Sequence, residues 1–230
     1  MGGFFTYEEF WEIYKILYRQ FSDLISEPTK IGHTTLNEPI YTFKIGKDID
    51  NPKRTAKSSI LFTSLHHSRE PITLSMLVAI LIQYVRILQH PAKNSTLFSQ
   101  IDIEFIPVIN IDSYKLINKS YGTSSWSKTK TLRKNRQPTP SCSFYRTGTD
   151  LNRNYSYKFD YGAPSRSTGG SNNPCAQDYR GPHPFSAPET QALKSFIENS
   201  PQITSALNFH AYGDLWIYPY SFSPSTSNPT

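Results

Sequence analysis

The sequence has few cysteines, no long uninterrupted apolar run and no internal repeats. Its longest apolar stretch, residues 72–88, is broken by Gln83 and Arg86, whereas a membrane-spanning helix needs about 20 predominantly apolar residues. We therefore predict a buried helix there and no membrane span. The N-terminus lacks the basic start and apolar core of a secretory signal, so no signal peptide is expected in this chain. Without repeats or a shift in composition, the sequence favours one domain over residues 1–230.

Only two cysteines are present, Cys142 and Cys175, so at most one disulfide bond can form within the chain. If they are bonded, the bond closes a large loop and contributes about 3–4 kcal/mol by the loop-entropy estimate. Two free buried thiols are the alternative, and the residues themselves do not decide between these states.

Acidic residues are fewer than basic ones, 18 against 24, which gives a net charge of +6. The basic residues peak in the segment KTKTLRKNR, residues 128–136. Such a run could attract nucleic acid or heparin. The chain has no nucleic-acid fold signature, however, and the run lacks the interleaved aromatic residues that stack on bases. We expect a solvated loop with one functional arginine and no nucleic-acid partner; a polyanion-binding loop is the weaker alternative.

The N-terminal sequence MGGFFT fits two interpretations. Gly2 and Thr6 match the pattern for N-myristoylation. The sequence TYEE predicts instead a capping box, in which Thr6 caps a helix and Glu9 reaches back to the cap; that helix would run to about residue 25. The helix is the favoured interpretation, and lipidation stays open.

Hydrophobic residues make up 37% of the chain, which is enough for a real core, and their pattern predicts an α/β fold. Alternation over residues 39–46 is typical of a half-buried strand. The more continuous apolar runs at 58–66 and 101–109 predict interior strands, separated by a helix over about 72–90. Strand, helix and strand at this spacing indicate a crossover unit with parallel strands. We therefore predict a mixed, largely parallel sheet flanked by helices.

The second half of the chain is less regular. Residues 111–185 are rich in polar residues, glycine and proline, show little periodicity, and are predicted to be irregular. Ser186 and Glu189 then predict a second capping box, which starts a helix to about residue 199. The sequence further predicts a strand over 203–212, which delivers a histidine at its end, and a short strand over 215–220.

Metal-binding side chains follow two of the predicted strands. His67 and Glu70 lie three residues apart directly after one strand, and His210 lies at the end of another. The carboxyl ends of strands in such a sheet meet in one crevice. Two histidines and one carboxylate, with water in the fourth place, form a catalytic zinc site. His66 competes with His67, although neighbouring side chains of an extended chain point apart. The spacing alone does not separate this site from an exposed turn plus a core histidine.

Four segments in order resemble the catalytic domain of the carboxypeptidase A/B family of zinc metallocarboxypeptidases. They are HSRE (67–70), LRKNR (132–136), DLNRNY (150–155) and NFHAYGDLWIYPY (208–220). No single segment is specific, but the ordered set is, and the resemblance extends over residues 6–222. It implies that His67, Glu70 and His210 bind one Zn²⁺ per chain.

The resemblance also implies roles in binding peptide or protein C-termini. Arg133 would lie beside the scissile carbonyl, where a fixed positive charge stabilises the oxyanion. Asn152 and Arg153 would hold the terminal carboxylate, and Tyr212 would line a subsite. Arg69 would reach a subsite further along the peptide or form a structural salt bridge. Cys142 and Cys175 fall where many members of the family have a disulfide bond.

One part of the family's machinery has no counterpart in the sequence. Its general-base glutamate and a mobile tyrosine lie beyond the strand that ends at residue 220. The expected domain over 1–230 thus lacks its last strand and helix portion. The resemblance implies a monomeric zinc-dependent carboxypeptidase, with a catalytically inactive zinc- and peptide-binding form as the alternative. Family habit and the cysteine pair favour a secreted or lumenal location, although no signal peptide is expected from the sequence given.

Overall fold

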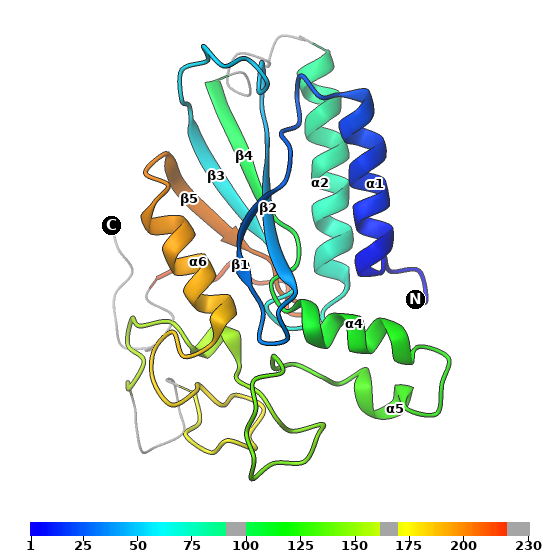
Figure 1. Cartoon of the computed structure of the whole chain (residues 1–230), viewed down its shortest axis with the longest axis vertical. Helices are drawn as coiled ribbons and strands as arrows, with labels where there is room; N and C mark the ends of the chain where they lie inside the picture. Colours follow the sequence, from blue (N-terminus) through cyan, green and yellow to red (C-terminus); the bar gives the residue numbers. More distant parts are fainter. Residues whose placement is uncertain (91–99, 162–169, 220–230) are drawn as a thin grey trace.

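A five-stranded mixed sheet organises the structure, a computed structural model that describes residues 1–90, 100–161 and 170–219 (Figure 1). Its strand order is β1-β2-β4-β3-β5. β2 lies antiparallel to β1 and β4, whereas β3 lies parallel to β4 and β5, so the predicted mixed α/β sheet is confirmed. The strands are β1 (Thr29–His33), β2 (Pro39–Ile45), β3 (Ser58–Thr63), β4 (Ile101–Ile106) and β5 (Ile203–Asn208).

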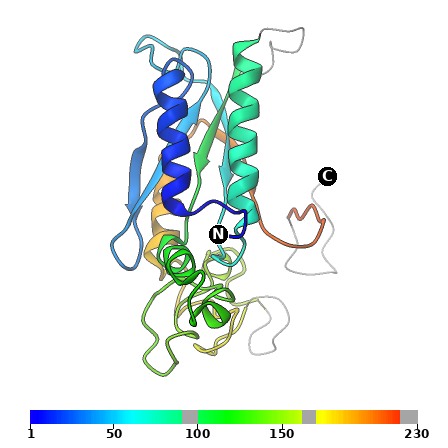
Figure 2. The ribbon, with the colours of Figure 1, turned by 90° about the vertical axis from the view of Figure 1, so that its right-hand side faces the viewer.

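Helices cover both faces of the sheet (Figures 1 and 2). α1 (Tyr7–Gln20) and α2 (Ile72–Gln89) lie side by side on one face, and α6 (Pro188–Glu198) lies on the other. Within the described part of the chain, α2 is the one helix whose length and composition would let it cross a membrane. One row of its apolar side chains is buried in the core, as predicted: Leu74, Leu77, Leu81, Val85 and Leu88.

Close packing on each face depends on particular residues. On the face of α1 and α2, the Phe43 ring of β2 stacks on Phe105 of β4 with the centroids 5.3 Å apart. Phe10 of α1 lies 6.4 Å from Phe43, so α1 joins the same aromatic cluster. On the opposite face, a Cβ atom at Gly32 would lie 2.5 Å from the Ala192 Cβ atom. Glycine at this position therefore allows α6 to approach β1.

The first predicted capping box is confirmed and the second is wrong. The Thr6 hydroxyl accepts a hydrogen bond from the Glu9 amide at 3.1 Å, and the Glu9 carboxylate accepts one from the Thr6 amide at 2.7 Å. Ser186 does not cap α6, because its hydroxyl accepts a hydrogen bond from the Asn154 amide group. The Glu189 carboxylate is fully buried and bonds the Thr35 backbone amide at 2.9 Å. Tertiary contacts have replaced the local cap.

The structure also corrects several predicted elements. The segment 111–185 was predicted to be irregular, but it contains α4 (Ile111–Ser120), the short helix α5 (Trp126–Thr129) and a 3₁₀ turn at Leu151–Arg153. β1 was not predicted at all. β5 is shorter than the predicted strand over 203–212, and residues 215–219 form no strand. The remainder of the predicted strand over 215–220 lies outside the described residues.

The basic segment 128–136 is only partly exposed, so the predicted solvated loop is wrong for its second half. Lys134 is 4% exposed, and its ammonium group donates to the Pro174 carbonyl at 2.8 Å. Arg136 is also buried, with its guanidinium 4.2 Å from the centre of the Phe144 ring. These contacts anchor the segment to the disulfide-bonded region and remove two charges from the surface that would bind a polyanion.

A disulfide bond and a buried asparagine stabilise the irregular region that lies below the sheet in Figure 1. Cys142 and Cys175 form a disulfide bond, as the family resemblance implied. Asn154 is fully buried, and its amide group donates to the Arg180 and His183 carbonyls at 2.7 and 3.1 Å. Its side-chain oxygen accepts from the Ala187 backbone amide and the Thr190 hydroxyl at the start of α6. The segment after the 3₁₀ turn is thereby held against α6.

Candidate metal centre

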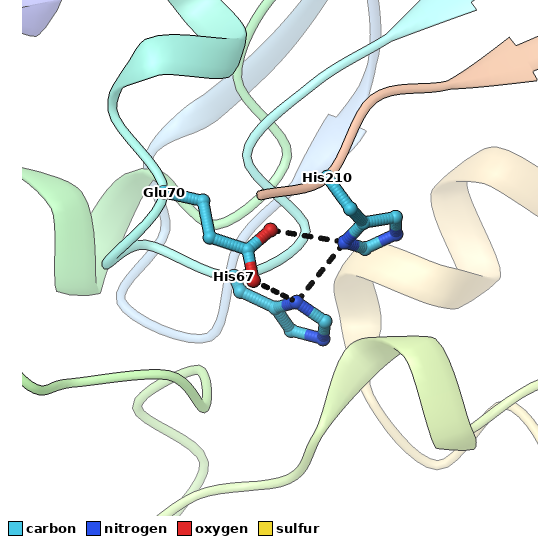
Figure 3. Close-up of side chains that lie close together, drawn as sticks. All are labelled: His67, Glu70 and His210. Atoms are coloured by element: carbon cyan, nitrogen blue, oxygen red, sulfur yellow. Dashed lines mark hydrogen bonds and ion pairs between the residues drawn. The ribbon is translucent and has the colours of Figure 1, made fainter. Parts of the chain in front are cut away.

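The predicted metal-binding residues come together because β3 and β5 are neighbours. The two strands are parallel, and Thr63 pairs with Asn208 at their carboxyl ends. The chain reaches His67 four residues after β3 ends and His210 two residues after β5 ends. Between β3 and α2, the Glu70 backbone amide bonds the His67 carbonyl at 3.1 Å and closes a turn. This turn directs His67 and Glu70 toward the same point as His210 (Figure 3).

Three donor groups face one another at this point (Figure 3). The His67 Nδ1 atom lies 2.9 Å from Glu70 Oε1, and the His210 Nδ1 atom lies 3.0 Å from Glu70 Oε2. The two Nδ1 atoms are 3.1 Å apart. Atoms bound tetrahedrally to zinc at about 2.0–2.1 Å lie about 3.3 Å from each other, slightly more than these separations. A single cation would occupy both nitrogen lone pairs, so the three residues fit a zinc ion.

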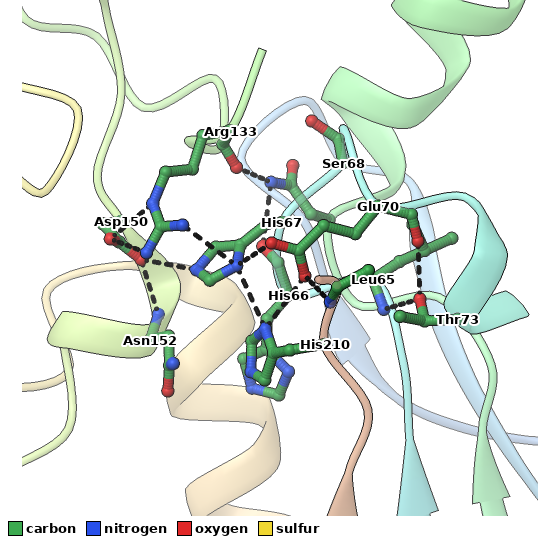
Figure 4. Close-up of polar contacts among 12 residues, drawn as sticks. Leu65, His66, His67, Ser68, Glu70, Thr73, Arg133, Asp150, Asn152 and His210 are labelled. Carbon is green, nitrogen blue, oxygen red and sulfur yellow. Dashed lines mark hydrogen bonds and ion pairs between the residues drawn. The ribbon is translucent and has the colours of Figure 1, made fainter. Parts of the chain in front are cut away.

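Asp150 orients His67 from behind. Its carboxylate is fully buried and accepts a hydrogen bond from the His67 Nε2 atom at 3.1 Å, on the side of the ring away from Glu70 (Figure 4). The Asn152 backbone amide bonds the same oxygen at 3.0 Å. Metal-binding histidines commonly donate their second nitrogen to a carboxylate in this way. Asp150 was not predicted as a site residue, although it begins the DLNRNY segment.

Burial and hydrogen bonding set the charge states in and around the donor cluster, which consists of His67, Glu70 and His210. Burial alone would raise the pKa of Glu70, but hydrogen bonds with His210 and His67 lower it to about 2. Burial likewise opposes ionisation of Asp150, whereas the bond with His67 and the charge of Arg133 hold its pKa well below the ordinary range. Both carboxylates are therefore anionic at neutral pH and can bind or orient a cation.

His66 lies beside His210 but contributes no atom to the donor group of His67, Glu70 and His210. Its Nε2 atom lies 2.7 Å from the Tyr155 hydroxyl, and its Nδ1 atom is buried without a hydrogen-bond partner in the described part of the chain. Burial lowers the pKa of His66 to about 3, so the ring is neutral. The structure thus places His67, and not its neighbour, with Glu70 and His210.

Arg133 lies beside the cluster and is held there by Asp150 (Figure 4). Its Nε and Nη2 atoms bond Asp150 Oδ2 at 2.9 and 2.8 Å, and its Nη1 atom lies 3.3 Å from the His67 Nδ1 atom. The fully buried Asn110 side chain donates to the carbonyls of both Arg133 and His66, which ties the two loops together. Two of the three guanidinium nitrogens are therefore occupied, and Nη1 remains directed at the cluster.

The other predicted substrate residues are placed differently. Arg153 is half-buried near Asp150, bonds the Asn152 carbonyl at 2.9 Å and forms no ion pair within the part of the chain that the structure describes. Tyr212 is fully exposed. Arg69 is exposed and lines a pocket of about 240 Å³ together with Tyr121 and Trp126. Asn152 and Arg153 thus lie close to the cluster, whereas Tyr212 points into solvent.

The sequence matches the zinc carboxypeptidase family over residues 14–230. It is 30% identical to rat mast cell carboxypeptidase A over 195 residues, which are 84% of this chain and 42% of that protein. It is 33% identical to bovine carboxypeptidase B over 201 residues, 87% of this chain and 43% of that one. A third relative, 31% identical over 208 residues, is an inactive metallocarboxypeptidase of Talaromyces stipitatus; the match covers 87% of this chain and 32% of that protein.

Solved structures show the same fold. Thrombin-activatable fibrinolysis inhibitor superposes with a TM-score of 0.78 and 25% identity, over 97% of this chain and 51% of the other. Carboxypeptidase A from Helicoverpa armigera superposes with a TM-score of 0.68 and 24% identity, over 91% of this chain and 46% of the other. The chain spans less than half the length of the curated relatives named above. From its sequence match and its fold, the chain belongs to the zinc carboxypeptidase family.

Proposed function

We propose that the protein is a zinc-dependent metallocarboxypeptidase that hydrolyses the C-terminal peptide bond of peptides or proteins. The observation that carries this proposal is the convergence of His67, Glu70 and His210, whose donor atoms lie within 4.8 Å of one another beside the Arg133 guanidinium. These three residues would hold one Zn²⁺. When bound, zinc polarises a carbonyl and lowers the pKa of a coordinated water toward about 7.

The residues around the cluster fit the recognition of a free C-terminus. An arginine and an amide side chain can hold a carboxylate in a bidentate arrangement, and Arg153 with Asn152 offers that pair. Arg133 would act at the scissile carbonyl, because its Nη1 atom faces the cluster while Asp150 fixes the rest of the guanidinium. A positive charge fixed in advance stabilises an oxyanion without reorganisation during the reaction.

Replacing Arg153 with alanine is expected to weaken the binding of peptides with a free C-terminus but not of the same peptides with an amidated C-terminus. Only the free form carries the carboxylate, and a hydrogen bond to a charged group contributes about 1.5–3 kcal/mol, which corresponds to roughly 10–150-fold in affinity. Calorimetric titration of the zinc-loaded protein with both peptides measures this difference. Arg86→Ala, on the exposed side of α2, serves as the matched control. Equal weakening for both peptides would remove Arg153 from the proposed role.

A catalytically inactive zinc- and peptide-binding protein is the second candidate. Among the described residues, Glu70 belongs to the cluster and Asp150 contacts it, and both carboxylates are already bonded to histidines. Neither is free to act as a general base, and a missing base is expected to cost about 10²–10⁴-fold in rate. One relative is itself an inactive metallocarboxypeptidase. Chelator-sensitive hydrolysis of a blocked dipeptide would support the enzyme; binding without hydrolysis would support the inactive form.

A further inference from the structure

The second ring nitrogen of His210 has its own hydrogen-bond partner. His210 Nδ1 faces Glu70 and His67, and its Nε2 atom lies on the opposite side of the ring (Figure 3). That Nε2 atom lies 2.9 Å from the amide nitrogen of the Asn208 side chain. The side-chain oxygen of Asn208 in turn lies 2.9 Å from the Thr63 hydroxyl. A chain of three side chains therefore runs from the end of β3 to the candidate metal ligand.

Metal binding decides which end of the Asn208 amide faces the ring. A neutral histidine that binds a metal through Nδ1 carries its hydrogen on Nε2, so Nε2 must donate a hydrogen bond. The amide nitrogen of asparagine is also a donor, and two donors cannot bond each other. Turning the amide over exchanges its oxygen and nitrogen, which occupy nearly equivalent positions. The Thr63 hydroxyl can donate or accept, so both hydrogen bonds survive the exchange.

We propose that Asn208 is a positioning residue for zinc: its side-chain oxygen accepts a hydrogen bond from His210 Nε2, while its amide group donates to Thr63. This inference rests on the proposed zinc site. Asn208 would thereby select the tautomer of His210 that leaves Nδ1 free to bind the metal. It would also fix the plane of the imidazole ring.

The sheet is what makes this contact rigid. Thr63 and Asn208 are paired across β3 and β5, and the next residue, Phe209, donates its backbone amide to the Thr63 carbonyl at 2.9 Å. The Asn208 backbone is therefore held against β3 next to the contact. Support of this kind matters most for His210, whose side chain is 30% exposed, whereas that of His67 is 3% exposed and is held by Asp150. The less buried ligand depends on an outer partner for its orientation.

Two substitutions at residue 208 test the proposal. Asn208→Leu removes the acceptor and is expected to weaken zinc binding about 10–100-fold, the usual cost of losing an outer hydrogen bond to a metal ligand. Asn208→Asp keeps an acceptor toward His210, and Thr63 can donate to it, so zinc binding should be retained or tightened. Competition with a chromophoric chelator measures both affinities without any assay of activity.

Controls separate positioning from a general effect on the fold. Ser205→Leu places the same side chain on an exposed position of β5 and should leave zinc affinity unchanged. Thermal unfolding of the metal-free variants shows whether either Asn208 variant is destabilised. Equal losses for Asn208→Leu and Asn208→Asp, or no loss for Asn208→Leu, would overturn the proposal while wild-type zinc binding stands. A wild-type chain that binds no zinc would overturn the proposed function, and this inference with it.

Discussion

Replacing His210 with alanine is expected to weaken zinc binding about 10²–10⁴-fold, so that less than one ion per chain is retained after gel filtration. Protein zinc sites bind with about 10–16 kcal/mol, so one of three protein ligands accounts for roughly 3–5 kcal/mol, or about 10²–10⁴-fold in affinity. His210 is the most informative ligand to remove, because it is the least buried of the three. Its loss should leave the metal-free fold nearly intact. Metal analysis after gel filtration, with chelator competition, measures the stoichiometry and the affinity.

The matched control is His183→Ala, because His183 is exposed and its Nδ1 atom lies 3.0 Å from the Pro184 carbonyl oxygen. That variant should bind zinc like the wild type. Zinc also raises the unfolding temperature of a protein that binds it only when folded. Wild type and His183→Ala should therefore show a larger zinc-dependent rise than His210→Ala. Unchanged stoichiometry in His210→Ala would contradict the assignment of this histidine as a ligand.

The convergence of the proposed metal ligands could be predicted from the sequence because two simple rules place them together. His67 and Glu70 are three residues apart, so one turn can direct both to one point. His210 joins them because the carboxyl ends of neighbouring parallel strands meet, and β3 and β5 are indeed neighbours. The resemblance of four ordered segments to zinc carboxypeptidases supplied the remaining argument. The same rules could not place Asp150, which reaches His67 from an irregular segment whose path no spacing encodes.

Helix α4 and the wrong second cap share a physical cause, which is that polar residues take part in the packing. The buried face of helix α4 includes Ser113 and Ser120, so the hydrophobic periodicity of this helix is weak in the sequence. The Ser113 hydroxyl bonds the Lys134 carbonyl at 2.7 Å, a contact that depends on the tertiary fold. The second cap was predicted from the local spacing of Ser186 and Glu189. In the structure, the buried Glu189 carboxylate instead bonds Asn135 and Thr35, which are distant in the sequence. The pattern of hydrophobic residues in a sequence does not reveal hydrogen bonds between residues that are distant in the sequence.

Asp150→Asn is expected to lower the free energy of unfolding of the metal-free protein by about 3–5 kcal/mol, the usual effect of removing one partner from a buried ion pair. The Asp150 side chain is fully buried, and it neutralises Arg133, whose side chain is 14% exposed. Without the carboxylate, the arginine keeps its charge but loses its counter-ion. The Asn amide group would also present a donor toward the guanidinium. Urea unfolding in the presence of a chelator measures the loss without any contribution from zinc.

The chain offers a matched control in an aspartate–arginine pair whose aspartate is exposed, Asp160 with Arg180 at 3.2 Å. The Asp160 side chain is 79% exposed, so Asp160→Asn should cost at most about 1 kcal/mol, since solvent screens an exposed pair. The two substitutions are chemically identical and differ in burial. A large loss of unfolding free energy for Asp150→Asn, beside a small loss for Asp160→Asn, would show that Asp150 stabilises the fold in addition to orienting His67. Similar small losses would mean that water or another group compensates Arg133, and Asp150 would then act on the metal ligand alone.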